Sequence, residues 1–314
     1  MNLTFDPQTL AEDLCVVRRN YADFFGGLTA ADWERPVKRG PHEWTLHETV
    51  AHLCGLSGAG LESIQAILRG ETYVFAGLDD RYHFTAFNRR GIDEHLPLPM
   101  NDLCAEFLGI LDQTSDVARS LQPGQGEWAS SMPIYNRPVK IVEAISIMMF
   151  HAGLHHSAQV AEPAGVPPLW MQLTPEVRHR VIGRVMRALS LLYRYDLGGD
   201  LRASFAFRID GPGGGSWHVD VSPESTASDE GEIDHPSLVI QLRQTDDFCR
   251  MFTGRMNLPY ALLTGQLKLR GNLRLFTRFG SLFSVEARPD HAEPHAKDIR
   301  HENDSVPASQ SAPR

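Results

Sequence analysis

The apolar residues of this chain change their period once, near Gly198. Before that point they recur every three or four residues, as in Leu10, Leu14 and Val17, which is the spacing of one face of an α-helix. After it, segments such as 217–221 alternate apolar and polar residues, as half-buried strands do. The chain is therefore expected to be multidomain, with an α region followed by an α+β region, and its 314 residues leave room for two domains.

The first half predicts four long amphipathic helices, for which a four-helix bundle is the simplest architecture. Thr45 with Glu48 three residues later is a capping-box pattern for the second helix, and Asn101 is expected to cap the third. A shorter helical piece is expected at residues 86–92. The long helices are expected at residues 7–26, 45–68, 101–121 and 140–161.

The second half predicts strands at residues 203–209, 217–221, 237–242 and 266–270, and helices at 246–253, 257–263 and 273–283. Residues 222–234 are acidic and are expected to form a loop. The expected division is a bundle at residues 1–165, a helical linker at 166–197, an α+β domain at 198–287 and a disordered tail at 288–314.

Composition excludes several classes of protein. The formal net charge of −9 argues against nucleic acid as the main partner, because phosphate binding needs a basic face. We expect no signal peptide and no membrane span, because the N-terminus lacks a basic-then-apolar pattern and no run of about 18 apolar residues occurs. The cysteines form no Cys-x-x-Cys pair, so a cytoplasmic protein with reduced thiols is expected; they are Cys15, Cys54, Cys104 and Cys249.

Histidines are the most informative residues of the first half. His151 and His155 are four apart on a predicted helix, so both imidazoles lie on one face and can reach a single ion. His52, beside Val50 and Leu53 on the second predicted helix, is the best candidate for a third ligand. Three neutral nitrogens with open positions suit Zn²⁺, Ni²⁺ or Fe²⁺, so the pattern leaves the metal open.

Other histidines compete for this role. His42 and His47 lie near His52, but His47 is five residues away, which is not a shared helical face. His156 is about 100° round an α-helix from His155 and is expected to face elsewhere. Helical histidine pairs at this spacing also occur without metal, so the spacing alone leaves a purely structural role open.

Two segments resemble the signatures of the DinB-like superfamily. Residues 43–53 place Trp44 eight residues before His52, as in the first signature, and residues 151–160 resemble the second, His-x-x-x-His followed by a glutamine. Residues 87–89 resemble the mid-domain segment of the mycothiol-dependent maleylpyruvate isomerase branch. The resemblance covers about residues 5–165, and Ala158 replaces the small glycine of the family.

This resemblance implies that His52, His151 and His155 bind a divalent ion, usually zinc in such proteins. It also makes Asn88 and Gln159 candidates for contact with a ligand histidine or the substrate, although helix packing and capping explain them equally well.

The second half resembles the sterol carrier protein type 2 fold, over about residues 198–286. The pattern is carried by residues 248–257, 263–271 and 279–283, with a Gly-then-Pro turn from Gly254 to Pro259. The resemblance implies an apolar tunnel that binds a lipid or another hydrophobic ligand. A cap on the active site and a dimer surface are the alternatives, because fold does not imply function.

Together the resemblances imply an enzyme in which a bound metal activates a low-molecular-weight thiol such as mycothiol. The activity would be S-transfer to a small electrophilic substrate or its cis–trans isomerisation. Cys54, two residues past His52, points away from that ligand and is not expected to react. The alternatives are a non-catalytic carrier of a hydrophobic molecule and a divergent metal-dependent tailoring enzyme of secondary metabolism. A homodimer is a further expectation.

Overall fold

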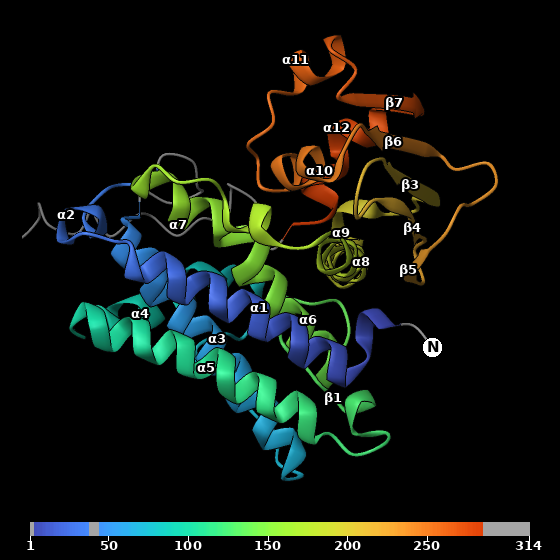
Figure 1. Ribbon diagram of the computed structural model, residues 1–314. Coiled ribbons are helices and arrows are strands. Elements are labelled where there is room, and N and C mark those ends of the chain that lie inside the picture. The colour runs from blue at the N-terminus through green and yellow to red at the C-terminus, as the bar shows by residue number, and fades with distance from the viewer. Residues whose placement is uncertain (1–2, 38–43, 285–314) are drawn as a thin grey trace, which may run out of the picture.

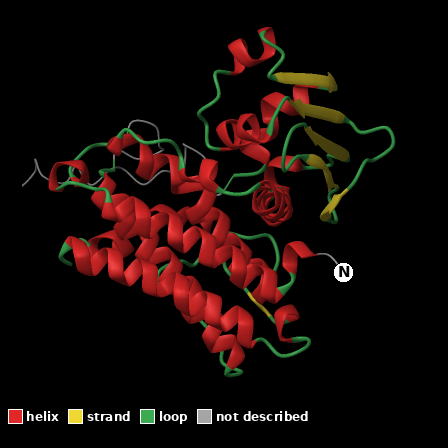
Figure 2. Cartoon of the chain, viewed as in Figure 1, coloured by secondary structure: helices red, strands yellow, loops and turns green. Residues whose placement is uncertain are grey.

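The computed structural model describes residues 3–37 and 44–284 and confirms the predicted fold class, a helical region followed by an α+β region with a mixed sheet (Figures 1 and 2). His42 and the tail beyond residue 284 lie outside the described residues. The helices of the first region are α1 (Pro7–Gly26), α2 (Ala30–Trp33), α3 (Leu46–Leu68), α4 (Phe84–His95), α5 (Met100–Ser120), α6 (Ile141–Phe150) and α7 (Ser157–Ala164).

The bundle is formed by the long helices packing on one another. α1 packs against α5 and α6, and α3 packs against α4, α5 and α6. Leu10 and Leu14, from the periodic face of α1, are fully buried. The Thr45 capping box is confirmed, because Thr45 Oγ1 accepts a hydrogen bond from the Glu48 amide at 3.1 Å and Glu48 Oε2 accepts one from the Thr45 amide at 2.9 Å.

Two helix predictions are wrong in detail. Asn101 does not cap α5: the extended residue Pro99 precedes the helix, so Asn101 lies inside its first turn. The predicted fourth helix is not one continuous α-helix. Residues His151–His156 form a π-helical turn between α6 and α7, and α7 passes through Pro163 to end before Gly165, whose φ is 71°.

The C-terminal sheet has the order β5-β4-β3-β6-β7, in which β3 and β6 are parallel and the other pairs are antiparallel. The predicted loop at residues 222–234 is wrong, because it contains strand β5. Only Ser228 of that strand is buried, so the sequence lacks the alternation of apolar and polar residues that would predict a strand there. The strands are β3 (Ala203–Ile209), β4 (Gly215–Val221), β5 (Thr226–Glu230), β6 (Leu238–Leu242) and β7 (Leu267–Gly271).

Helix α8 (Pro175–Leu192) joins the two regions; Figure 1 shows it end-on between the bundle and the sheet. On one side, Arg184 donates to Asp13 of α1 at 2.8 Å, and both side chains are buried. On the other side, Gly183 lies so close to the indole of Trp217 that a Cβ there would be 3.4 Å from Nε1. Most buried apolar side chains of both regions form one continuous cluster, and Phe75, Leu78 and Ile134 form a second, smaller one.

The remaining helices belong to the C-terminal region, and α12 (Leu273–Leu282) packs on the sheet. α12 places Phe279 against Phe205 and Phe207 of β3, with ring centroids 5.6 and 5.7 Å apart. α10 (Thr245–Phe252) and α11 (Leu258–Leu263) lie between β6 and β7 in sequence, and the short α9 (Tyr195–Gly198) follows α8. In residues 3–37 and 44–284, no helix has both the length and the apolar character needed to cross a bilayer.

Candidate metal centre

The π-helical turn brings together two histidines that an α-helix would separate. The Nε2 atoms of His151 and His156 are 2.9 Å apart, and their ring centroids are 4.3 Å apart. A π-helix has more residues per turn than an α-helix, so residues five apart return to nearly the same face. The expectation that His156 faces elsewhere is therefore wrong, because it assumed an α-helical 100° per residue.

Contacts from α1 fit the π-helical turn into the bundle. Tyr21 donates a hydrogen bond from its hydroxyl to the Ala152 carbonyl at 3.0 Å. Gly153 lies against Val17, and a Cβ on it would come within 2.9 Å of a valine methyl. The altered hydrogen bonding of the turn is thus supported by a buried phenol, and a small residue is required where α1 approaches.

His52 reaches the same place from α3. Its Nε2 is 3.4 Å from Nε2 of His151, and its ring is 4.9 Å from that of His156. The Trp44 ring lies 4.8 Å from the His52 ring. The eight-residue spacing from Trp44 to His52 therefore places an indole over the imidazole, which gives this sequence pattern a structural meaning.

The nitrogen spacing fits a divalent ion. One ligand atom from each of His52, His151 and His156 lies within 4.8 Å of the other two. Two nitrogens bound to zinc at about 2.05 Å in tetrahedral geometry are about 3.3 Å apart, which matches the 3.4 Å between His52 and His151. The 2.9 Å between His151 and His156 is shorter and is the length of a hydrogen bond between a protonated and an unprotonated nitrogen.

His155 lies beside this group but is not one of its three members. Its ring is nearly parallel to that of His151, with an interplanar angle of 15° and ring centroids 5.8 Å apart. The centroid of the His155 ring is also 4.7 Å from that of His156. The C-terminal region approaches it through Phe252, whose ring is 6.4 Å away. Burial, and to a lesser extent the positive charge of Arg255, lower the pKa of His155 to about 4.

The three histidines of the turn are neutral near pH 7. Burial lowers the pKa of His151 and His156 well below the usual value, and the neighbouring imidazoles lower it further. Among the described residues, the buried Nδ1 of His156 has no hydrogen-bond partner. Neutral imidazoles with available nitrogens are the form that binds Zn²⁺ and similar ions, so the donor set fits the implied metal.

The two predicted polar contacts lie at different places. Gln159 is buried on α7, and its side chain partly opposes the lowering of the pKa of His156. Asn88 is buried on α4, which packs on α3, and its Oδ1 has no hydrogen-bond partner among the described residues. His47 faces Trp33, with ring centroids 6.1 Å apart, and is not part of the histidine group.

The sequence does not predict the part that the C-terminal region plays at this centre. Arg255 follows α10 and binds Glu162 of α7 through two hydrogen bonds of 2.9 and 3.2 Å, with its side chain only 6% exposed. Phe252, from the same segment, lies near both Phe150 and His155. Nothing in the local pattern around residue 255 indicates a partner 93 residues away.

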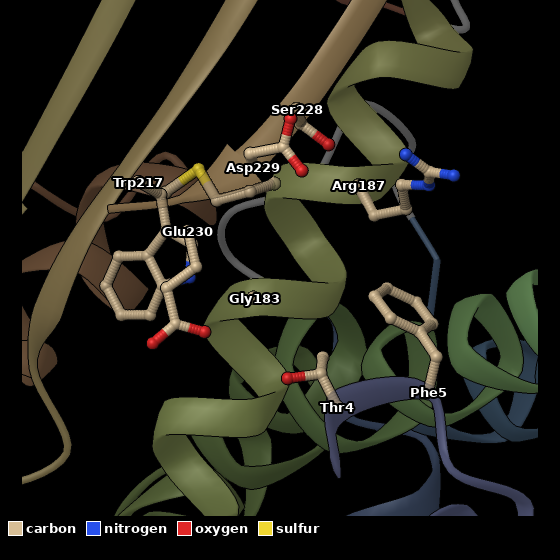
Figure 3. Close-up of a pocket in the computed structure, with 9 residues that line it drawn as sticks. Thr4, Phe5, Gly183, Arg187, Trp217, Ser228, Asp229 and Glu230 are labelled. Atoms are coloured by element: carbon tan, nitrogen blue, oxygen red, sulfur yellow. The ribbon is translucent and has the colours of Figure 1, made fainter. Parts of the chain in front are cut away.

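A cavity of about 210 Å³ lies elsewhere, between the N-terminal segment, α8 and the sheet (Figure 3). None of the four clustered histidines lines it. Trp217 and Glu230 line it from the sheet, and Arg187 lines it from α8. Arg187 already donates to Glu143 at 2.7 Å, so its charge is compensated within the bundle.

Comparison with known proteins supports both halves of the fold. Residues 16–157 match the family described as mycothiol maleylpyruvate isomerase N-terminal domain, and residues 195–284 match the SCP-2 sterol transfer family. A crystal structure of a histidine-to-alanine mutant of the mycothiol-dependent maleylpyruvate isomerase is 12% identical, with a TM-score of 0.50, covering 83% of this chain and 92% of that one. The crystal structure of the mycothiol-dependent maleylpyruvate isomerase itself is 13% identical, with a TM-score of 0.49, and the match covers 79% of this chain and 90% of that one.

Curated relatives match only a part of the chain. Hydroxysteroid dehydrogenase-like protein 2 of Homo sapiens is 27% identical over 114 residues, and its counterpart in Bos taurus is 26% identical over 113. Each match covers 36% of this chain and 27% of the relative, so the chain spans about a quarter of the length of these relatives.

Proposed function

Because residues 16–157 belong to the mycothiol maleylpyruvate isomerase N-terminal domain family and residues 195–284 to the SCP-2 sterol transfer family, we propose that this protein is a divalent-metal-dependent enzyme acting with a low-molecular-weight thiol. Its activity is S-transfer to, or cis–trans isomerisation of, a small electrophilic substrate. The observation that carries the proposal is the group of three imidazoles, two of them buried, that α3 and the π-helical turn bring together.

The proposed ligands are His52, His151 and His155, which leaves a position open for the thiol. The spacing of His52 and His151 supports these two as a pair of ligands. A bound divalent ion lowers the pKa of a thiol and so supplies a nucleophile at neutral pH. The ion itself is Zn²⁺, Ni²⁺ or Fe²⁺, all of which accept imidazole nitrogen.

The protein's own residues prepare this chemistry in three ways. Burial keeps the imidazoles of the turn neutral, so they need not lose a proton before binding the ion. Trp44 covers one side of His52 and limits the access of water to it. The buried side chains of Asn88 and Gln159 are proposed to contact a ligand histidine or the substrate, since each has an oxygen without a hydrogen-bond partner in the described part of the chain.

The C-terminal region is proposed to act as a cap on the histidine group. Phe252 and the Arg255–Glu162 ion pair lie beside the turn, which favours a cap over a fully independent lipid carrier. Binding of a hydrophobic ligand by the same domain remains compatible with its family. The cytoplasmic location and the homodimer predicted from the sequence remain parts of the proposal.

His156 gives the non-catalytic alternative a specific basis. If both His155 and His156 bound the ion together with His52 and His151, four protein ligands would close the coordination sphere, as in structural zinc sites. The protein would then be a carrier of a hydrophobic molecule with a structural metal. The absorption spectrum of the Co²⁺-substituted protein distinguishes the open catalytic site from the closed structural site. A thiol added to an open site changes the spectrum, whereas a closed site leaves it unchanged.

The proposed activity is tested by incubating the metal-loaded protein with mycothiol and maleylpyruvate, and separately with a panel of small electrophiles. We expect thiol-dependent turnover that is lost in His52→Ala and kept in His47→Ala, whose side chain lies on the same helix outside the histidine group. Turnover that is equal with and without thiol would reject thiol activation and leave metal-dependent tailoring chemistry, including hydrolysis, as the alternative.

A further inference from the structure

Helix α11 presents apolar side chains to solvent instead of to the core. Leu263 is 86% exposed and Tyr260 is 57% exposed, and Leu258 and Leu262 are also exposed. Ala261 is the only buried residue of this helix. An apolar cluster on such a short helix is unusual for a surface that meets only water.

The charged residues from α11 to residue 284 are all basic. Residues 257–284 contain four basic residues and no acidic one, in a chain whose formal net charge is −9. Lys268 and Arg270 are exposed and point to the same side of β7, because they are two residues apart on a strand. Neither forms an ion pair within residues 3–37 and 44–284, whereas many arginines elsewhere in the protein do.

These apolar and basic side chains belong to one surface. α11 contacts β7, and the Lys268 side chain passes over Gly265, where a Cβ would be 3.6 Å from its Cε. β7 is an edge strand of the sheet, and among residues 3–37 and 44–284 no further strand pairs with its free edge. Figure 1 shows α11 and β7 at the end of the molecule that is remote from the bundle, where a flat surface could reach them. We call this surface, made of Leu258, Tyr260, Leu262, Leu263, Lys268 and Arg270, the α11 patch.

We propose that the α11 patch docks this protein on an anionic lipid bilayer. The leucines and Tyr260 would enter the boundary between headgroups and acyl chains, while Lys268 and Arg270 would meet the lipid phosphates. Such docking is peripheral, and no part of it depends on the metal centre.

A second copy of the chain fits the patch less well. In a two-fold dimer the same patch faces itself, so Lys268 and Arg270 of one copy would face the same cations of the other. An anionic bilayer complements both features at once, since it offers negative headgroups above an apolar interior. The combination of exposed leucines with unpaired cations therefore favours lipid over self-association.

The test is sedimentation of the full-length protein with vesicles of equimolar phosphatidylcholine and phosphatidylglycerol, with pure phosphatidylcholine vesicles in parallel. We expect binding to the anionic vesicles that weakens with added salt. The double variant Lys268→Glu and Arg270→Glu should bind at least tenfold more weakly, since each basic residue near an anionic surface strengthens binding about fivefold. Leu263→Asp should also release the protein.

Val74→Asp is the matched control, because Val74 is 75% exposed but lies in the helical region. Thermal melting checks that all variants are folded, which is expected for changes at exposed positions. Retained binding by Val74→Asp with loss in the two patch variants would support the docking surface. Absence of binding by the wild-type protein, or equal binding by all variants, would overturn it. A dimer in analytical ultracentrifugation that Leu263→Asp dissociates would instead assign the patch to a second copy.

Discussion

The Nε2 atoms of His151 and His156 lie 2.9 Å apart although the residues are five positions apart in sequence. This contact exists because the chain between α6 and α7 forms a π-helical turn, supported by the hydroxyl of Tyr21. Single π-helical turns are frequent at functional sites, and here the turn points two imidazoles at a third from α3. The geometry therefore adds a fourth histidine to the three that the family resemblance implies.

The paired variants His155→Ala and His156→Ala identify the third ligand. We expect His155→Ala to lose the bound ion and His156→Ala to keep it, because the His151–His156 distance is that of a hydrogen bond and is short for two ligands of one ion. The metal content of each purified variant is measured by elemental analysis. Loss in His156→Ala with retention in His155→Ala would exchange their roles, and loss in both would indicate a closed site.

The candidate centre could be predicted from the sequence only where its backbone is regular. His52 and His151 lie close together because α3 packs on α6, and His151 directly follows the last residue of α6. His156 was assigned to the wrong face, because no residue type specifies a π-helical turn and the α-helical period was extended through it. Phe252 and Arg255 could not be predicted, since their approach depends on how the two regions pack.

Asp13→Asn is expected to destabilise the protein strongly. Asp13 is 1% exposed and binds both Arg180 and the fully buried Arg184 of α8, so the variant leaves a buried guanidinium without its counter-charge. The expected loss is about 3–5 kcal/mol in the free energy of unfolding, measured by urea denaturation. Asp112→Asn is the control: its pair with Arg18 is exposed, and it should cost less than about 1 kcal/mol.

Glu143→Gln is expected to change how stability depends on pH. Burial raises the pKa of Glu143, but hydrogen bonds from Arg137, the Lys140 amide and Arg187 outweigh it and hold this pKa at about 2, below the usual 4.5. The carboxylate therefore stabilises the folded state above about pH 4.5, and this contribution is lost as the pH falls toward 2.

Urea denaturation across this pH range should show the wild-type protein more stable than Glu143→Gln at pH 6, with the two converging in acid. Glu127→Gln provides the comparison, because Glu127 is exposed in its pair with Lys140. A constant difference between wild type and Glu143→Gln from pH 6 down to 2 would contradict this role of the carboxylate.

Cys54→Ser is expected to keep the activity. The Cys54 thiol is buried 3.6 Å from the Leu103 carbonyl of α5, which agrees with the prediction that it points away from the His52 ligand. Burial also raises its pKa, so a thiolate is disfavoured at neutral pH. Turnover with a small thiol should remain within about twofold of wild type; complete loss would mean that a protein nucleophile takes part.

The fold was predictable wherever apolar residues keep a clear period. Strand β3 has the predicted bounds, and the Thr45 cap begins α3 as the capping box indicates. Strand β5 was missed because it is polar at an edge of the sheet, with only Ser228 buried. β5 pairs with β4 through backbone hydrogen bonds, which do not require particular side chains and so cannot be predicted from residue type.

The measurement that tests the central claim most directly is elemental analysis of the full-length protein beside His151→Ala and His47→Ala. His151 is the histidine that contacts both His52 and His156, so its loss should remove the ion in every version of the ligand set. We predict about one divalent ion per chain in the wild type and in His47→Ala, and none in His151→Ala. A wild-type protein that takes up no ion when metal is supplied, or a His151→Ala variant that keeps a full ion, would contradict the metal centre.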